Sequence, residues 1–340
     1  MAEFTKLSAL LAGAAFALSG SVAFAQEYTM VISSWAPPTH GINAKMWPKF
    51  VEMVEEATDG RVSAELKLGI APPPAQMDLV QDGAADVSIL FNGYQPGRFV
   101  ASKMIELPGY DGSAEAASVA YWRTYEAFLA EANEYRGVKL IGLSTHGPAQ
   151  LHSASPVTSI EQISGLKVRI PGGVGGDVGA ALGATGIQVP APKVYETLAS
   201  KAADGVVMPM ESRKGFKLTE VAQNVYEVPG GLYRGAFAFI MNEDFFADLP
   251  ADLQQELNDK VFGEPFSREL GKIWDEIDAI GRDATLATNG NAINAASAAD
   301  VAVFSKIAAE VTTKVIGEVN GIGIDAQAAY DMIKAEMAAY

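Results

Sequence analysis

Segments with strand patterns and segments with helix patterns alternate along most of the chain, and this alternation restricts the possible folds more than any other feature. Residues 27–33 (EYTMVIS), 61–68 (RVSAELKL) and 86–90 (DVSIL) have the β-branched or alternating apolar character of strands. Residues 43–58 carry apolar side chains every three or four positions, as an amphipathic helix does, and a short helix is expected at 77–82. Such a βαβαβ unit predicts a mainly parallel sheet with its ligand chemistry at the carboxyl ends of the strands.

A second series of strands and helices begins near residue 138. Strands are expected at 138–143, 166–170 and 205–208, and helices at 176–184 and 194–203. The two series predict two α/β lobes. Because no low-complexity linker separates them, we expect the chain to cross between the lobes several times.

The last third of the chain has helical periodicity. Residues 251–287 place apolar side chains at helical spacing almost continuously, with a kink expected at Gly263 and Pro265. Residues 294–340 are Ala-rich and are expected to add further helices. With 340 residues, of which 49% are hydrophobic, the chain is long enough for two domains and too apolar for disorder to be its main state.

The N-terminus has the pattern of a secretory signal peptide. Lys6 precedes an apolar run over 7–18, and Ala23-Phe24-Ala25 supplies the small residues of a cleavage site. The run is too short to span a bilayer, which takes roughly 20 apolar residues. An amphipathic helix is the alternative, but apolar residues surround the run on all sides. We therefore expect cleavage after residue 25 and a soluble mature protein without stable membrane insertion.

Charge and cysteine content exclude several functions. The chain has 41 acidic and 25 basic residues, a formal net charge of −16, and such a surface repels nucleic acid. An anion could still bind at a local site that overcomes this field. The absence of cysteine excludes disulfides, thiolate metal sites and thiol catalysis.

Motifs for enzymes, metals and cofactors are absent from the sequence. It contains no HExxH, GxSxG or GxxxxGK[ST] pattern. The three histidines, at 40, 146 and 152, lack the spacing of a metal site, so we expect neither a metal nor a cofactor. The glycine-rich segment 171–179 does not fit a dinucleotide fingerprint, because position 178 is valine. It is expected to form a tight turn before a helix whose N-terminus remains a possible anion site.

Arg169 is the candidate residue that the sequence singles out. It lies in the apolar strand GLKVRI, immediately before Pro171, and therefore emerges at the carboxyl end of that strand. A guanidinium group is always charged, and its planar fork suits a carboxylate in bidentate fashion. On these grounds alone, a structural salt bridge with Asp or Glu explains Arg169 equally well.

Several spaced motifs together indicate a family. They are 93–99 (GYQPGRF), 165–172 (GLKVRIPG), 191–196 (APKVYE), 204–205 (DG), 216–221 (FKLTEV) and 241–242 (MN). With these segments the chain resembles the substrate-binding proteins of tripartite ATP-independent periplasmic (TRAP) transporters, of the dicarboxylate-binding-protein (DctP) type.

The resemblance implies an α/β periplasmic solute-binding fold, with two lobes joined by hinge strands and a long helix, that closes over an organic acid. It also implies delivery of this acid to membrane subunits that use an ion gradient. In this family the arginine of the K-[VI]-R motif binds the ligand carboxylate, and Arg169 occupies that position.

The resemblance also implies a division of the chain. Residues 26–149 and about 240–280 are expected to form lobe I. Residues 150–239 and about 281–340, including the C-terminal helices, are expected to form lobe II. Such a protein works in the periplasm, and its function is binding, without catalysis.

Two departures from the family pattern indicate the type of ligand. Many members have D-G-x-E-N-P where this chain has 204–209 (DGVVMP), and a second arginine where it has 147–152 (GPAQLH). A second polar group on the ligand would remain unpaired, at a cost of about 1–3 kcal/mol. We therefore expect a monocarboxylate with an apolar or aromatic body, with a dicarboxylate or sugar acid as the alternative. The alternative of another class is a secreted enzyme that acts on an organic acid through Glu211, Asp204 or His152.

The remaining site predictions follow from strand ends and from the family resemblance. Aromatic and sulfur-containing side chains just beyond strands are expected to form walls, and Phe237 lies in 235–241, which resembles a hinge-crossing strand. Arg213 is a candidate second cation, and His40, His152 and Glu211 are candidate polar contacts. The full set of predicted ligand-binding residues is Arg169, Trp35, Phe91, Asn92, His152, Met208, Met210, Glu211, Arg213 and Phe237.

Overall fold

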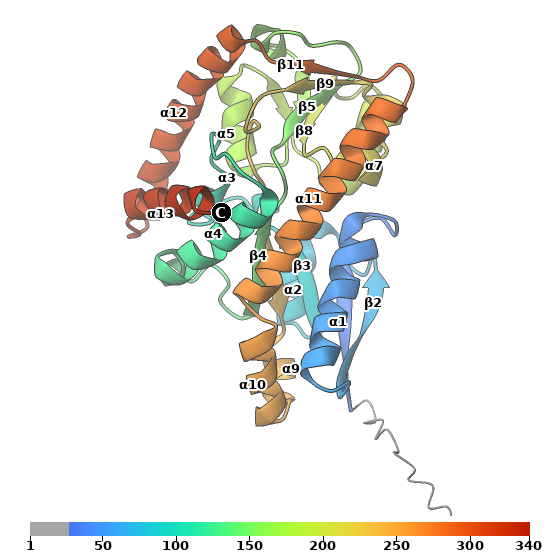
Figure 1. Ribbon diagram of the computed structural model, residues 1–340, viewed down its shortest axis with the longest axis vertical. Helices are drawn as coiled ribbons and strands as arrows, with labels where there is room; N and C mark the ends of the chain where they lie inside the picture. The colour runs from blue at the N-terminus through green and yellow to red at the C-terminus, as the bar shows by residue number, and fades with distance from the viewer. Residues whose placement is uncertain (1–26) are drawn as a thin grey trace, which may run out of the picture.

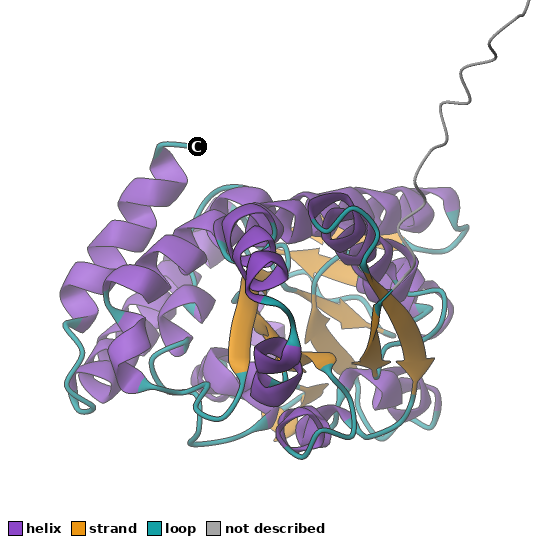
Figure 2. Cartoon of the chain, turned by 90° about the horizontal axis from the view of Figure 1, so that it is seen from below, coloured by secondary structure: helices purple, strands orange, loops and turns teal. Residues whose placement is uncertain are grey.

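Two β-sheets covered by helices organise residues 27–340, the part of the chain that this computed structural model describes (Figures 1 and 2). We call the unit around the five-stranded sheet lobe I and the unit around the six-stranded sheet lobe II. The signal peptide predicted at 1–25 lies outside the described residues. None of the helices found in 27–340 has the length and apolar character that a membrane span requires.

Lobe I contains the first predicted βαβαβ unit. Its sheet has the order β2-β1-β3-β10-β4, in which β1 pairs in parallel with β2 and β3, whereas β10 runs antiparallel to β3 and β4. The first predicted helix is observed as a π-helical turn followed by α1, which buries Trp47, Phe50 and Val54. The elements are β1 (Tyr28–Ser34), the π turn (Ile42–Met46), α1 (Trp47–Ala57), β2 (Val62–Leu68), α2 (Gln76–Gln81), β3 (Val87–Phe91), α3 (Lys103–Glu106), α4 (Ala114–Ala127), β4 (Lys139–Thr145), β10 (Ala236–Met241) and α9 (Glu243–Asp248).

Lobe II contains the second series. Its sheet has the order β11-β9-β5-β8-β6-β7, and β5 runs antiparallel to β8 and β9. The elements are β5 (Gln150–Ser153), β6 (Lys167–Arg169), α5 (Gly173–Ala181), β7 (Thr185–Ile187), α6 (Val194–Ala199), β8 (Gly205–Met208), α7 (Ser212–Gly215), α8 (Leu218–Val221), β9 (Asn224–Glu227) and β11 (Ala292–Ala295).

Both sheets are mainly parallel, as predicted, and each contains one antiparallel strand. The antiparallel strands are β10 in lobe I and β5 in lobe II. Each of them enters its sheet from the other lobe. It therefore starts at the end of the sheet that faces the other lobe, which is where the remaining strands of that sheet end. For this reason it runs in the opposite direction to them.

Two adjacent crossings and one long helix connect the lobes. Residues 146–149 join β4 to β5, and residues 228–235 join β9 to β10. The crossings are hydrogen-bonded to each other, since Ala149 N donates to Tyr233 O at 3.0 Å and Leu232 N donates to Ala149 O at 2.8 Å. The helix α11 (Glu264–Ala287) packs on α4 in lobe I and on α7 in lobe II, and Figure 1 shows it along both lobes.

The C-terminal third differs from the prediction in two places. The helix expected over 251–287 is two helices, α10 (Ala251–Lys260) and α11, because Gly263 has φ +86° and leaves the helical conformation. Residues expected to be helical from 294 begin with the edge strand β11, whose partner β9 is distant in the sequence. The helices α12 (Ala298–Asn320) and α13 (Ala326–Ala338) follow and pack on α5 and α4.

The glycine-rich N-terminus of α5 binds a carboxylate of the protein itself. Glu106 Oε2 accepts the backbone N–H of Val174 at 2.9 Å, and Oε1 accepts that of Ala236 at 3.2 Å. A Cβ on Gly173 would lie only 2.3 Å from Oε2, so glycine makes this approach possible. Burial raises the pKa of Glu106 to about 7. These hydrogen bonds join α3, α5 and β10. The N-terminus of α5, which the sequence indicated as a possible anion site, is therefore occupied by the carboxylate of Glu106.

Glycines on α11 permit its close packing, which gives a first prediction. At Gly271 a Cβ would lie 2.5 Å from Cα of Glu115 in α4. We expect Gly271→Ala to lower the free energy of unfolding by about 1–3 kcal/mol, because the two helices must move apart. The control is Gly317→Ala in α12, where nothing lies within 4 Å of the added methyl group. This control is expected to stabilise by about 0.5–1 kcal/mol. Denaturant titration measures both, and equal effects would contradict the packing argument.

Candidate functional site

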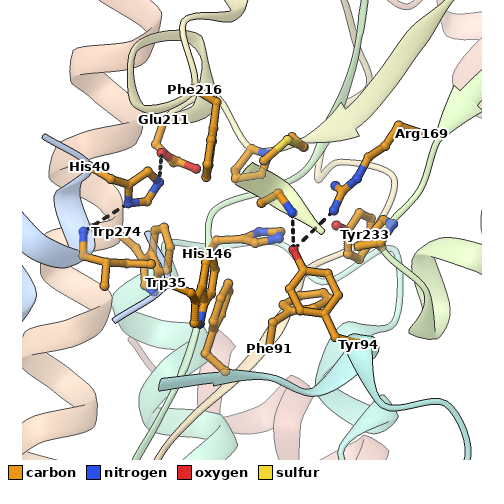
Figure 3. Close-up of a pocket in the computed structure, with 16 residues that line it drawn as sticks. Trp35, His40, Phe91, Tyr94, His146, Arg169, Glu211, Phe216, Tyr233 and Trp274 are labelled. Carbon is orange, nitrogen blue, oxygen red and sulfur yellow. Dashed lines mark hydrogen bonds and ion pairs between the residues drawn. The ribbon is translucent and has the colours of Figure 1, made fainter. Parts of the chain in front are cut away.

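A cavity lies between the lobes (Figure 3). Its 16 lining residues come from lobe I, from lobe II, from both crossings and from α11. They are Trp35, His40, Ile42, Phe91, Tyr94, His146, Arg169, Pro171, Ala191, Met208, Pro209, Glu211, Phe216, Tyr233, Phe237 and Trp274.

Arg169 occupies one end of this cavity. It is the last residue of β6 and is 1% exposed. Its Nε donates to Val189 O at 2.8 Å, and its Nη2 donates to the hydroxyl of Tyr94 at 3.3 Å. No carboxylate within residues 27–340 lies at ion-pair distance from Arg169, so the structural salt bridge considered as an alternative is not observed there. A buried guanidinium without a counter-ion is costly, and a bound anion would offset that cost.

Tyr94 connects the lobes at this end of the cavity. It follows β3 of lobe I, and both groups that donate to its hydroxyl belong to lobe II. Besides Arg169, the backbone N–H of Ala191 donates to it at 2.7 Å. The lobes are therefore in contact beside Arg169.

His40 and Glu211 form the opposite end, as Figure 3 shows. His40 Nε2 of lobe I lies 2.9 Å from Glu211 Oε2 of lobe II, and both side chains are buried. The backbone N–H of Ile42 donates to His40 Nδ1 at 3.2 Å, so Nδ1 carries no hydrogen.

Aromatic rings form the walls between the two ends. Phe237 contacts Phe91 and Trp274 with ring centroids 5.1 Å apart in each case, and Phe216 packs on His40 at 4.7 Å. The indole N–H of Trp35 donates to Ile89 O, and that of Trp274 to Ser144 Oγ. Because these donors already have partners, the two indoles contribute only apolar surface.

His146 adds a neutral polar group to the cavity. Its Nδ1 lies 2.6 Å from Gly147 O, which can only accept, so the ring carries its hydrogen on Nδ1. Burial, together with the charges of Arg234 and Arg169, lowers the pKa of His146 to about 4. A Cβ on Gly235 would lie 2.5 Å from Nε2, so glycine is required there. His146 therefore gives the site no positive charge at neutral pH.

Six of the ten predicted ligand-binding residues line the cavity: Trp35, Phe91, Arg169, Met208, Glu211 and Phe237. The other four do not. Asn92 points into lobe I, where its Nδ2 donates to the hydroxyl of Tyr135 at 2.8 Å. His152 lies within the sheet of lobe II, with Nε2 2.8 Å from Met208 O. Met210 is buried outside the lining.

Arg213 is also directed away from the cavity. Its Nε donates to Thr285 Oγ1 at 2.9 Å, and its two terminal nitrogens donate to Ala222 O and Asn291 Oδ1. The guanidinium thus joins α7 to the end of α11 and to the segment before β11. The predicted roles of Asn92, His152, Met210 and Arg213 in ligand binding receive no support from this geometry.

The predictions omitted several lining residues. Tyr94 lies in the segment 93–99 already used for the family resemblance, so its position carried a signal. Trp274 occupies the helical stripe of α11 and resembles an ordinary core residue in the sequence. His146 and Tyr233 lie in the crossings, and only the pairing of 146–149 with 228–235 brings them to one place.

Asp278 supports the Glu211 end from α11. Its Oδ1 accepts the backbone N–H of Glu211 at 2.7 Å, and a Cβ on Gly147 would lie 1.7 Å from Oδ2. Part of the residue reaches solvent, but its carboxyl group is enclosed. Burial, together with the charges of Glu211 and Asp275, raises the pKa of Asp278 to about 8. At neutral pH this carboxyl group is therefore mostly protonated.

The raised pKa of Asp278 predicts a pH dependence of stability. The folded value of about 8 exceeds the ordinary 3.8, so the contribution of this group is complete below pH 3.8 and is lost as pH rises through 8. The slope between these values is at most about 1.4 kcal/mol per pH unit. Asp278→Asn, an isosteric neutral replacement, should remove this decline. Denaturant titrations of both proteins from pH 4 to 9 measure the difference, and parallel profiles would contradict the assignment.

Comparison with known proteins identifies the architecture. Residues 32–318 match the profile of the family described as bacterial extracellular solute-binding protein, family 7 (DctP). A TRAP periplasmic solute-binding protein from Bordetella bronchiseptica, solved with bound (R)- and (S)-mandelate, is 36% identical. It superposes with a TM-score of 0.88 over 92% of this chain and 99% of its own.

Two further solved structures are similar. A TRAP solute-binding protein from an unidentified marine microbe, specific for aromatic acid ligands and solved with 3-hydroxybenzoate, is 26% identical, with a TM-score of 0.86 over 93% of this chain and 99% of its own. A TRAP solute-binding protein from Rhodoferax ferrireducens, solved with copurified benzoate, is 27% identical, with a TM-score of 0.85 over 92% of this chain and 98% of its own.

Proposed function

Because the chain belongs to family 7 of the bacterial extracellular solute-binding proteins, the solute-binding components of TRAP transporters, we propose that it captures an aromatic monocarboxylate between its lobes. The observation that carries this proposal is the buried guanidinium of Arg169 at one end of a cavity with aromatic walls. The ligand carboxylate would bind the guanidinium, and its ring would pack against Phe91, Phe237 and Trp274.

The distribution of charge in the cavity favours a single carboxylate. Among the described lining residues, Arg169 is the only permanent cation, and burial lowers the pKa of His146 so that it is neutral at neutral pH. The other charged lining group is Glu211, which would repel a second carboxylate. A sugar acid would need several further polar partners, whereas most of the remaining lining is apolar. A dicarboxylate or a sugar acid is therefore the weaker candidate.

The similar structures support the same type of ligand. The three proteins described above were solved with mandelate, 3-hydroxybenzoate and benzoate, each an aromatic monocarboxylate. In this chain Met208 lines the cavity with an apolar side chain. An apolar side chain at this position suits a ring.

Binding with lobe closure accounts for the arrangement better than catalysis. The residues considered for an enzyme do not converge, since His152 lies within its sheet and Asp204 Oδ2 accepts the backbone N–H of Lys167. The cavity is built from both lobes, so a ligand gains contacts on closure and shifts the equilibrium to the closed state. We place this process in the periplasm, after removal of residues 1–25, with the TRAP membrane subunits as recipients of the ligand.

A ligand panel tests the type of solute. Mature protein is heated with benzoate, mandelate, succinate, a hexuronate or an amino acid, each at saturating concentration. A ligand at 100 times its Kd should stabilise by about 2.7 kcal/mol and raise the melting temperature by several degrees. We expect benzoate or mandelate to do so. A rise with succinate or the hexuronate alone would contradict the proposal.

Arg169 is tested by substitution. We expect Arg169→Ala to weaken binding of benzoate or mandelate about 100-fold, because the carboxylate loses its charged partner. Arg169→Lys keeps the charge without the bidentate fork. Its affinity for these acids should lie between those of the wild type and of Arg169→Ala. Isothermal titration calorimetry measures the affinities, and circular dichroism checks folding. The control is Arg282→Ala, which removes an exposed ion pair with Glu227. Unchanged affinity in folded Arg169→Ala would refute the assignment.

A further inference from the structure

The carboxylate of Glu211 is buried beside the cavity with incomplete pairing. Glu211 is 4% exposed and lines the cavity at the end opposite Arg169 (Figure 3). Its Oε2 lies 2.9 Å from His40 Nε2. Within the described chain, no group donates a hydrogen bond to its Oε1. In Figure 3 this second oxygen points away from His40.

His40 does not form a hydrogen bond with Glu211. Its Nδ1 accepts the backbone N–H of Ile42. Although Nε2 is close to Oε2, its N–H bond is not aligned with that oxygen as a hydrogen bond requires. The other acidic group nearby, Asp278, accepts the backbone N–H of Glu211 through Oδ1, and among the described residues its carboxyl group forms no hydrogen bond with that of Glu211.

A carboxylate oxygen that faces a largely apolar cavity and has no donor from the protein is unfavourable unless water or a bound molecule supplies one. Arg169 and Glu211 also define a direction in the cavity. A ligand whose carboxylate binds Arg169 has its apolar body along the aromatic walls and its far end toward Glu211. A hydroxyl group at that far end would donate to Oε1, and a second carboxylate there would be repelled.

We propose that Glu211 accepts a hydrogen bond from a ring hydroxyl of the ligand, so that the site selects hydroxylated aromatic monocarboxylates over the unsubstituted acids. This inference rests on the proposed function, and it names the substituent that the same site recognises. Glu211 is thus a specificity-determining residue, while Arg169 provides the affinity that both kinds of acid share.

Calorimetric titration of the wild-type protein with benzoate, 3-hydroxybenzoate, 4-hydroxybenzoate and terephthalate provides the first test. A hydrogen bond to a charged acceptor is among the strong ones. We therefore expect at least one hydroxybenzoate to bind about tenfold or more tightly than benzoate, and terephthalate to bind more weakly than benzoate. If benzoate binds and neither hydroxybenzoate binds more tightly, the inference is overturned while the proposed function stands. If none of the four acids binds, the proposed function itself fails.

Glu211→Gln provides the second test, because it keeps the shape of the side chain and removes its charge. We expect the preference for hydroxybenzoate to decrease to about threefold or less and benzoate affinity to stay within about threefold. Terephthalate should bind about tenfold more tightly than to the wild type, because the amide can donate to its second carboxylate. The matched control is Glu196→Gln, an exposed residue on α6 that should change none of these values.

Opposite effects on two ligands distinguish recognition from a purely structural role. If Glu211→Gln weakens benzoate, hydroxybenzoate and terephthalate by the same factor, Glu211 acts only through the structure and the inference is wrong. If the variant does not fold, the ratio of hydroxybenzoate to benzoate affinity in the wild type decides alone.

Discussion

The site is organised by a guanidinium group that is held inside the protein without a carboxylate partner. Burial of Arg169 is possible because Val189 O and the Tyr94 hydroxyl take two of its hydrogen bonds. Neither contact neutralises the charge. A bound anion would therefore offset the electrostatic cost that remains from burying the guanidinium. The protein as a whole has a charge of −16, and under the proposed function this local positive group would allow it to bind an acid.

Closure of the lobes connects this charge to the rest of the fold. One interlobe contact, from Tyr94 to Arg169 and Ala191, lies at the cationic end, and another, between His40 and Glu211, lies at the anionic end. The paired crossings and α11 connect the lobes and contribute His146, Tyr233 and Trp274 to the cavity. The segments that connect the lobes therefore also line the cavity. A ligand bound there would contact these segments and so influence the relative position of the lobes.

Local pattern was sufficient for much of the fold and for part of the site. The strands of the first βαβαβ unit, the strand that carries Arg169 and the helical C-terminal region follow from periodicity, because they depend on neighbours in the sequence. Local pattern was insufficient where a distant partner decides. The direction of β10 depends on the crossing from lobe II, and β11 exists only because β9 lies beside it. Asn92 follows β3, His152 lies in β5 and Arg213 lies in α7, but their side chains face other parts of the interior.

The sequence by itself determined the two-lobe α/β class, the absence of thiol chemistry, the unsuitability for nucleic acid and the position of Arg169 at a strand end. These properties depend on composition, local periodicity and motifs. Only the tertiary structure decided that Arg169 has no carboxylate partner among the described residues, that Glu211 faces it across the cavity, and that Trp274 and Tyr233 complete the walls. The reason is physical, since pairing and orientation depend on the distance between groups on different elements, and only the packing of the lobes sets that distance.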